Sequence, residues 1–454
     1  MLNPEIRRSI VTARPFEGWP DLRELHRLDP ARYPCLFESV SHGTPQARYD
    51  ILFAFPGDQM NLRTLAESED DGFLARFDAR WRREQLGDED LSGLPFSGGW
   101  FVYLGYELAG EIEATLHLPM DPPASDVLPI AVAVRCPAAI IRDHQTRRCI
   151  LVAETDSENL LSDMYRDLGA MGDAGDTPTL PHVEIVEDDP AGFLSGVERI
   201  KRYIYEGDVF QVNLSRAWQA RFDRAVEGAD LYAHLCRRNP APFAGVMRLG
   251  DTSVVSSSPE RLVSMRHDVV QTRPIAGTHP RDRDRHIDAR LSQALLLHPK
   301  ERAEHIMLID LERNDLGRVC VPGTVRVDEL MTLESYRHVH HIVSNVHGRC
   351  RPGVTPGQVM RAVFPGGTIT GCPKVRCMEI IAELEQAPRG AYTGALGYVN
   401  RDGSMDLNIL IRTLTLADRR VSLRAGAGIV ADSVPMRELE ETRAKARGLL
   451  EALS

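Results

Sequence analysis

The sequence lacks the cysteine patterns and apolar runs that mark several classes of protein. Its eight cysteines, spread over 454 residues, form no Cys-x-x-Cys pair and no repeated spacing, so we expect reduced thiols rather than a zinc site or a disulfide framework. No apolar run approaches the roughly 20 residues of a membrane-spanning helix, and the first residues, MLNPEIRRSI, lack the apolar core of a signal peptide. These absences predict a cytoplasmic protein without a membrane segment.

An excess of positive charge and the common nucleotide-binding motifs are also missing. The formal net charge is −11, which argues against nucleic acid or an anionic membrane as a partner. The absence of G-x-G-x-x-G, G-x-x-x-x-G-K-[ST] and G-x-S-x-G segments disfavours a dinucleotide-binding protein, a P-loop protein and a serine hydrolase. What is present, 43% hydrophobic and 26% charged residues, is typical of a globular protein.

The chain divides into two long regions and a polar connection. Residues 1–170 form the N-terminal region, residues 171–192 are rich in Gly, Asp and Pro and predict a linker or loop, and residues 193–454 form the C-terminal region. The periodicity predicts strands at 49–55, 100–108, 127–142 and 208–221 and helices at 193–207 and 436–453. This alternation predicts an α/β (α+β) fold, although periodicity does not fix the strand order.

The segment from Phe364 to Arg412 is the most informative part of the chain. It contains FPGGTITG, YTGALGY and MDLNILIRT, which place a Gly-Gly-Thr turn ahead of a helix and an arginine at the end of a strand. Backbone amides at Gly366 and Gly367 and the positive end of a helix can bind one carboxylate, and the Arg412 guanidinium can bind a second. The segment therefore predicts a site for a small dianion.

Two helical segments place carboxylates where a hard cation could bind. Glu304 lies beside an apolar stripe in residues 298–318, and Glu438, Glu441 and Lys445 share one face of the last helix because they lie three and four positions apart. Spacing alone favours a solvated charged face. A Mg²⁺ site needs only one or two protein carboxylates, so spacing cannot establish it.

Glu260 and the turn that follows it are a further candidate site. The sequence SSSPERLV places Glu260 after a proline at the end of an expected strand, and RPIAGTHPR places Gly277 and Thr278 in a tight turn. An acid next to backbone donors can form a catalytic pocket. The same residues can equally form a turn with a helix cap, and this alternative stays open.

Four histidines, at 338, 340, 341 and 347, occur in the segment SYRHVHHIVSNVHG. If the segment is a strand, neighbouring side chains alternate between its two faces. His340 and His341 would then point in opposite directions, which disfavours a metal cluster. We expect at most one functional histidine here.

Together these segments resemble the chorismate-utilising enzymes, which include anthranilate synthase component I, aminodeoxychorismate synthase component I, and the isochorismate and salicylate synthases. The resemblance is strong over 193–452 and extends weakly through YPCLFES (33–39), RYDIL (48–52) and PFSGGWFVYLGYEL (95–108). It implies a large fold in which two β-sheets pack together with helices outside.

The resemblance also implies roles for individual residues. Glu304 and Glu441 would bind Mg²⁺, with Glu438 as a further or water-mediated ligand, and the ion would neutralise a carboxylate of chorismate. Glu260 would be the general acid that protonates the leaving C4 hydroxyl, and His341 would be a proton donor or orienting group near the ring. The residues that would contact the substrate are Gly277, Thr278, Thr368, Tyr392, Arg412, Gly428 and Lys445. Lys374 would support charge in the pocket.

Two positions favour an amine-transferring member of the family. Water-using members have a lysine base where this chain has Gln211, and glutamine cannot deprotonate water. The best-known aminodeoxychorismate synthases carry PIKGT, whose lysine forms a covalent intermediate, but this chain reads PIAGT with Ala276, as anthranilate synthases do. QVNL, NPAPF, VHHIVS and PGGTITG resemble aminodeoxychorismate synthase, whereas LFES and SNVHG resemble anthranilate synthase.

On balance the sequence favours aminodeoxychorismate synthase component I, which makes 4-amino-4-deoxychorismate for para-aminobenzoate and folate. Ammonia would then add directly at C4 without the lysine intermediate, or another nucleophile would take the C2 step. The alternative is anthranilate synthase component I of the tryptophan pathway, which makes anthranilate and pyruvate. No segment resembles a glutamine amidotransferase, so a separate glutaminase subunit is expected to supply the ammonia.

Overall fold

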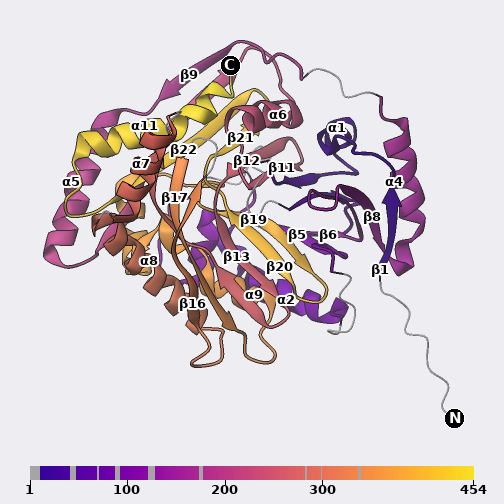
Figure 1. Ribbon diagram of the computed structural model, residues 1–454, viewed down its shortest axis with the longest axis horizontal. Helices are drawn as coiled ribbons and strands as arrows, with labels where there is room; N and C mark the ends of the chain where they lie inside the picture. The colour runs from indigo at the N-terminus through magenta and orange to yellow at the C-terminus, as the bar shows by residue number, and fades with distance from the viewer. Residues whose placement is uncertain are drawn as a thin grey trace.

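The protein consists of two antiparallel β-sheets that pack against each other, with helices on their outer faces (Figure 1). The computed structural model describes residues 11–40, 48–68, 71–86, 93–120, 128–172, 177–281, 284–297, 299–335 and 339–454. Within these ranges the first sheet has twelve strands and the second has ten. This architecture confirms the fold expected from the sequence.

The first sheet has the order β1-β8-β7-β3-β2-β11-β12-β21-β22-β10-β18, and β9 pairs with β10 outside this path. Its strands are β1 (Val11–Phe16), β2 (Cys35–Glu38), β3 (Tyr49–Ala54), β7 (Ala138–Asp143), β8 (Arg148–Glu154), β9 (Val183–Glu187), β10 (Gln211–Phe222), β11 (Phe243–Leu249), β12 (Thr252–Ser258), β18 (Gly371–Cys372), β21 (Thr413–Ala417) and β22 (Arg420–Ile429).

The second sheet has the order β15-β17-β14-β13-β20-β19-β5-β6-β4, and β16 pairs with β17. Its strands are β4 (Gln59–Leu62), β5 (Gly99–Leu104), β6 (Ala131–Cys136), β13 (Arg261–Arg266), β14 (Val269–Thr272), β15 (Ile275–Pro280), β16 (Arg326–Ser335), β17 (Val339–Arg349), β19 (Ala395–Asn400) and β20 (Met405–Ile409). Both sheets therefore combine strands from before and after residues 171–192.

The helices of the described residues cover the outer faces of the sheets (Figure 1). They are α1 (Leu22–Leu28), α2 (Gly72–Glu84), α3 (Ala109–Ile112), α4 (Asn159–Ala170), α5 (Pro190–Glu206), α6 (Gly228–Arg238), α7 (Arg285–Leu297), α8 (Pro299–Gly317), α9 (Pro356–Val363), α10 (Lys374–Glu385) and α11 (Pro435–Glu451). Helix α5 begins after Asp189, whose side chain accepts a hydrogen bond from the Ala191 amide, and ends at Gly207 with φ +86°. These are favourable start and stop residues, and the prediction of this helix is confirmed.

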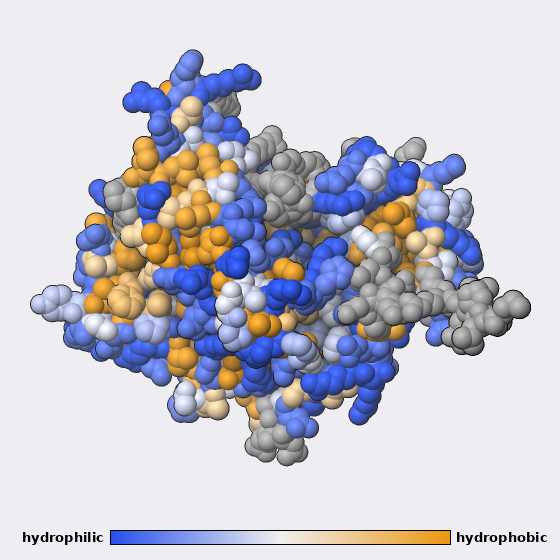
Figure 2. Space-filling model, turned by 60° about the horizontal axis from the view of Figure 1, so that its bottom comes forward, coloured by the Kyte–Doolittle hydropathy of each residue, from blue (hydrophilic) through white to orange (hydrophobic). Residues whose placement is uncertain are grey.

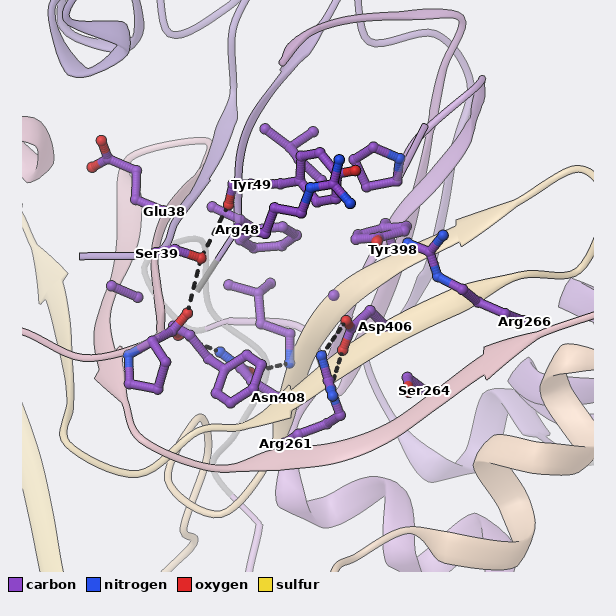
Figure 3. Close-up of a pocket in the computed structure, with 18 of the residues that line it drawn as sticks. Glu38, Ser39, Arg48, Tyr49, Arg261, Ser264, Arg266, Tyr398, Asp406 and Asn408 are labelled. Carbon is purple, nitrogen blue, oxygen red and sulfur yellow. Dashed lines mark hydrogen bonds and ion pairs between the residues drawn. The ribbon is translucent and has the colours of Figure 1, made fainter. Parts of the chain in front are cut away.

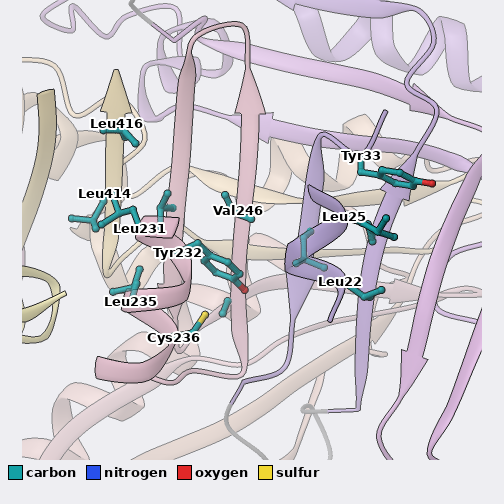
Figure 4. Packing of buried hydrophobic residues seen from close by; sticks show 14 of the residues in the cluster. Leu22, Leu25, Tyr33, Leu231, Tyr232, Leu235, Cys236, Val246, Leu414 and Leu416 are labelled. Atoms are coloured by element: carbon teal, nitrogen blue, oxygen red, sulfur yellow. The ribbon is translucent and has the colours of Figure 1, made fainter. Parts of the chain in front are cut away.

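Apolar side chains fill the space between the two sheets and the space beneath the helices. Between the sheets, the ring of Phe53 on β3 lies 6.0 Å from Phe101 on β5 and 6.1 Å from Tyr398 on β19. On the outer face of the first sheet, helices α1 and α6 pack with residues such as Leu25 and Tyr232 (Figure 4). Burial of this kind is the main stabilising contribution, and it fixes the sheets relative to each other.

The predicted strand run 127–142 differs from the structure in one respect. It divides at Pro137 into β6 and β7, which belong to different sheets. Proline has no backbone N–H to continue a ladder, so the chain changes sheets there. The stretch 171–192 was predicted as a linker or loop, yet it contributes β9, which pairs with β10.

All eight cysteines are free, and seven of them are buried. No helix of the described residues is long and apolar enough to span a membrane. Figure 2 shows that hydrophobic side chains gather on the left of that face, the side on which α5, α7 and α8 lie in Figure 1. The exposed large apolar residues of these three helices are Tyr205, Ile287, Leu297 and Ile306.

Candidate active site

The predicted metal ligand Glu304 lies close to Gly428, where the start of β10 pairs with the end of β22. The Nε2 of Gln211 donates a hydrogen bond to Oε1 of Glu304 on α8 at 2.8 Å. A Cβ added to Gly428 would overlap this Gln211 amide and would lie 3.6 Å from the same Glu304 oxygen. A side chain at position 428 would therefore displace the Gln211 amide, which holds Glu304 by a hydrogen bond.

Helix α11 brings Glu441 and Lys445 to the same strand. The Lys445 ammonium lies 2.7 Å from Oε1 of Glu441 and donates to the backbone oxygen of Gly426 at 2.9 Å. Glu438, one turn earlier, is buried. Because Gly426 and Gly428 are two positions apart on β22, Lys445, which pairs with Glu441, and Gln211, which binds Glu304, approach one short stretch of the same strand. The face was first interpreted as solvated: the Glu441 side chain is 48% exposed, whereas Glu438 is buried and Lys445 turns toward the protein.

Arg412 is a partly buried cation next to this stretch. Its Nη1 donates to the backbone oxygen of Lys445, and among the described residues no carboxylate forms an ion pair with it. Burial lowers the pKa of Arg412 to about 10, and the nearby Tyr392 and Glu441 oppose this effect. The hydroxyl of Tyr392 would touch a Cβ added to Gly426, and burial raises the pKa of Tyr392 to about 12. A partly buried guanidinium and a phenol that keeps its proton have the chemistry to bind an anion.

Glu260 lies in the adjoining wall, between β12 and β13. It is 5% exposed, and the Thr368 hydroxyl donates to its Oε1 at 2.8 Å. Burial raises the pKa of Glu260 to about 7. The hydrogen bonds from Thr368 and from the Ile275 amide, and the charge of Lys445, lower this pKa but do not cancel the effect of burial. A carboxyl group with a pKa near neutrality can hold a proton and release it in a reaction.

His341 lies on β17, next to the neighbouring strand β15. It pairs in register with Thr278 and forms a hydrogen bond with the backbone of Gly277, which has φ +71°. Burial lowers the pKa of His341 to about 4, and the charge of Arg412 adds to this effect. The imidazole is therefore neutral at neutral pH. Ala276 on β15 pairs in register with Ile342.

The other histidines of this segment have different partners. The Nδ1 of His340 contacts the Ser335 hydroxyl at 2.7 Å and its Nε2 contacts Asp288 at 2.9 Å, so His340 and His341 do point apart. His347 lies 3.4 Å from Asp328. His338 lies outside the described residues. The expectation that at most one histidine of this segment is functional stays a prediction.

The Gly-Gly-Thr turn differs from its prediction. Residues Gly367–Ile369 form a single 3₁₀ turn, and α10 begins only at Lys374, so no helix start lies at the glycines. A Cβ on Gly367 would overlap the Leu311 side chain of α8. The glycine allows α8 to pack closely, and this packing places Thr368 against Glu260.

A family profile described as chorismate binding enzyme matches residues 37–451. The chain belongs to the chorismate-binding enzyme family. An anthranilate synthase component I-like protein of Synechocystis sp. is 45% identical over 361 residues, which cover 79% of this chain and 73% of that protein. Aminodeoxychorismate synthase component 1 of Klebsiella aerogenes is 38% identical over 417 residues, which cover 89% of this chain and 90% of that protein.

The fold of this chorismate-binding enzyme is also that of a solved relative. The crystal structure of anthranilate synthase component I from Streptococcus pneumoniae has a TM-score of 0.79 at 30% sequence identity, and the match covers 90% of this chain and 93% of that chain. The family and the fold implied by the sequence motifs are therefore confirmed, whereas the roles of individual residues stay predictions.

A group of buried charges behind the site was not predicted from the sequence. Lys374 on α10 forms an ion pair with Asp315 on α8. The sequence analysis had instead placed the charge of Lys374 in the substrate pocket. Glu312, one turn earlier on α8, is also buried; burial and the neighbouring Asp315 raise its pKa to about 8. Glu260 is close enough to affect Glu312 electrostatically. The i, i+3 spacing of Glu312 and Asp315 was the available signal, but it is common on solvated helices.

A separate cavity of about 400 Å³ lies between the two sheets of this chorismate-binding enzyme (Figure 3). Its wall includes Phe37 to Ser39 from LFES and Pro242 and Phe243 from NPAPF. Arg261, whose guanidinium pairs with Asp406 at 2.8 Å, closes one side. None of the predicted catalytic residues lines this cavity, although Arg261 is the neighbour of Glu260.

Proposed function

We propose that the protein is the chorismate-converting subunit of an anthranilate synthase, which forms anthranilate and pyruvate from chorismate and ammonia. The observation that carries the proposal is Ala276. This position carries a lysine in the branch that works through a covalent lysine intermediate, and a methyl side chain cannot form one. Most of the similar proteins are named anthranilate synthase. The sequence alone favoured aminodeoxychorismate synthase, and the relatives support the alternative better.

The anion-binding groups would hold the substrate. Arg412 and Tyr392 would bind the enolpyruvyl carboxylate, because a partly buried guanidinium without a carboxylate ion pair gains most from an added anion. The backbone of Gly428 and the side of the site near Gly277, Thr278 and Thr368 would contact the ring. Lys445, which pairs with Glu441, would contribute positive charge beside the same carboxylate.

The carboxylates near β22 have the chemistry of a magnesium site. Among the described residues, no three His, Cys, Asp or Glu side chains gather into a metal-binding group, but Mg²⁺ is commonly held by one or two carboxylates together with substrate oxygens and water. Glu304 and Glu441 would hold the ion, with Glu438 as a further ligand. When bound, Mg²⁺ would neutralise a carboxylate of chorismate.

Glu260 and His341 would move the protons of the reaction. Ammonia would add at C2 while Glu260 protonates the C4 hydroxyl, which then leaves as water, since hydroxide is a poor leaving group. The ring would become aromatic when the C2 proton is removed and the C3–O bond breaks; the enolpyruvate that leaves takes up a proton at its methylene carbon and becomes pyruvate. His341 is neutral, so it could accept that proton, and this favours a base over the proton donor first considered.

Ammonia would come from a separate glutaminase subunit. The active site contains Gln211 rather than a lysine base, and ammonia is already a nucleophile that needs no deprotonation by the protein. We therefore expect that a high concentration of ammonium salt at alkaline pH supports turnover without any partner.

Aminodeoxychorismate synthase is the second candidate. The specific support is the Klebsiella aerogenes relative, which is similar over most of both chains, together with the segments QVNL, NPAPF, VHHIVS and PGGTITG. In this case ammonia would add at C4 and the enolpyruvyl group would stay on the ring.

Product analysis separates the two candidates. The purified chain is incubated with chorismate, MgCl₂ and ammonium salt, and products are identified by chromatography and fluorescence. Anthranilate and an equal amount of pyruvate, formed without any added lyase, would support the proposal. If 4-aminobenzoate appeared instead, and only after addition of aminodeoxychorismate lyase, the second candidate would replace it.

A further inference from the structure

Cys320 and Cys350 lie opposite each other on two short backbone segments at the end of the second sheet. Cys320 follows α8, Cys350 follows β17, and the two residues form an isolated antiparallel bridge. The amide of Val321 donates to the Arg349 oxygen at 2.7 Å, and the amide of Arg351 donates to the Val319 oxygen at 3.0 Å. The bonds flank the cysteines, so the cysteines occupy a non-hydrogen-bonded pair position.

This position has the spacing that a disulfide needs. In a non-hydrogen-bonded antiparallel pair the Cα atoms lie about 4.5 Å apart and the side chains lean toward each other, within the range of about 4.4–6.8 Å that disulfides span. The Cys350 thiol donates a hydrogen bond to the Met265 sulfur at 3.8 Å, and the backbone bridge sets Cys320 directly opposite it. The pair can therefore be joined without rearranging the backbone.

The two thiols differ in reactivity. The neighbouring Cys350 thiol lowers the pKa of the Cys320 thiol, and the charge of Arg351 lowers it further against the effect of burial. The Cys320 thiol, together with burial, raises the pKa of Cys350. The thiolate is the nucleophilic form of cysteine, so Cys320 is the residue that reacts first.

The other cysteines do not share these properties. Burial raises the pKa of each of the remaining thiols, which are Cys35, Cys136, Cys149, Cys236, Cys372 and Cys377. Cys320 and Cys350 also lie just beneath the surface, because the adjoining residues 321–323 and 351–353 are exposed. A small oxidant therefore has a short path to this pair.

We propose that Cys320 and Cys350 are an oxidation site that forms an intramolecular disulfide with hydrogen peroxide. The Cys320 thiolate attacks one peroxide oxygen, the O–O bond breaks and, after proton uptake, one water leaves, which gives a sulfenic acid. The Cys350 sulfur then attacks the Cys320 sulfur, and the sulfenic oxygen leaves as a second water. Two thiols are oxidised and one peroxide is reduced to two waters.

The disulfide would join the ends of two elements of the active site. Helix α8 carries Glu304, and β17 carries His341. The bond would close a loop that includes the whole of β16 and β17, and such closure reduces the freedom of the unfolded chain. Oxidation is therefore expected to raise the melting temperature of the protein, and a thiol reductant should reverse the rise.

Peptide mapping of the full-length protein tests the proposal. The reduced protein is treated with hydrogen peroxide, alkylated, digested without reductant and analysed by mass spectrometry. The expected product is one disulfide-linked pair of peptides, containing Cys320 and Cys350. Cys372→Ser, which changes the half-exposed cysteine, should give the same linked pair and serves as the matched control.

Single variants test the order of the two steps. In Cys350→Ser the sulfenic acid at Cys320 should persist and be captured by dimedone, whereas Cys320→Ser should give no dimedone adduct at Cys350. Linkage to any other cysteine, or no linkage in the wild-type protein at peroxide concentrations that form sulfenic acid, would overturn the site. An adduct at Cys350 in Cys320→Ser would overturn the order. Peptide mapping and melting of the wild-type protein decide whether the disulfide forms, even if a variant fails to fold.

Discussion

Replacement of Glu260 by glutamine should remove most of the turnover and make the protein more stable at alkaline pH. Glutamine can still accept the hydrogen bond from Thr368, which reaches Glu260 at 2.8 Å, but it cannot give a proton to the C4 hydroxyl. General acid catalysis typically contributes roughly 10²–10⁴-fold. We therefore expect kcat to fall by about this factor while the protein stays folded.

The effect on stability follows from the raised pKa of this carboxyl group. Burial raises the pKa of Glu260 from 4.5 to about 7, so the folded protein holds the proton more tightly than the unfolded chain. Below pH 4.5 Glu260 is protonated in both the folded and the unfolded protein, so the free energy of unfolding does not change. Between pH 4.5 and about 7 the folded protein loses stability as the pH rises, and above this range the loss is complete at about 3 kcal/mol as an upper estimate.

Urea unfolding and turnover measurements at several pH values provide the assay. Glu260→Gln should match wild type near pH 5 and exceed its free energy of unfolding near pH 8. Wild-type turnover should fall above about pH 7, provided that the free ammonia concentration is held constant across the series. Thr368→Val removes a hydrogen bond that lowers the pKa of Glu260 and should move this fall to higher pH. A glutamine variant that keeps more than about a tenth of the turnover, or is less stable at pH 8, would refute the reasoning.

Three further substitutions test other parts of the site. Gly428→Ala would displace the Gln211 amide that holds Glu304 and should raise the Mg²⁺ concentration that half-saturates turnover. Gly192→Ala, with open space around it, should not, and equal values for the two variants would contradict the proposed role of Glu304. Arg412→Gln should raise KM for chorismate roughly 10- to 100-fold, since hydrogen bonds to charged groups contribute about 1.5–3 kcal/mol, and an unchanged KM in steady-state assays would exclude substrate contact. Lys374→Met should lower the free energy of unfolding by about 3–5 kcal/mol, because Asp315 would stay buried without its partner; urea titration showing a loss below about 1 kcal/mol would show that the pair is not needed.

Long motifs in the sequence predicted the family, the fold and the segments that meet at the site. Helix α5 and the last helix were predictable because an apolar stripe and suitable end residues occur together. The two-sheet arrangement came from resemblance, since alternation along a strand says nothing about its neighbours. The change of sheets at Pro137 was missed because the apolar run continues across it.

The contacts inside the site depend on information that spacing does not contain. The pairing of Lys374 with Asp315 joins two helices whose relative position is set by packing, such as the close approach of Leu311 to Gly367. The bridge between Cys320 and Cys350 likewise depends on how the segments after α8 and β17 meet. Sequence reasoning identified each cysteine but had no signal for their pairing.

The interleaving of the two regions in both sheets has a consequence for limited proteolysis. Strand β2 is hydrogen-bonded to β11, and β5 to β19, so ladders connect the parts of the chain on either side of residues 171–192. A single peptide-bond cleavage between Pro178 and His182 would therefore leave two fragments that stay associated in native buffer and separate only when denatured. Either fragment produced alone would expose the unpaired edges left by its missing counterpart, and co-expression of the two should restore a soluble complex.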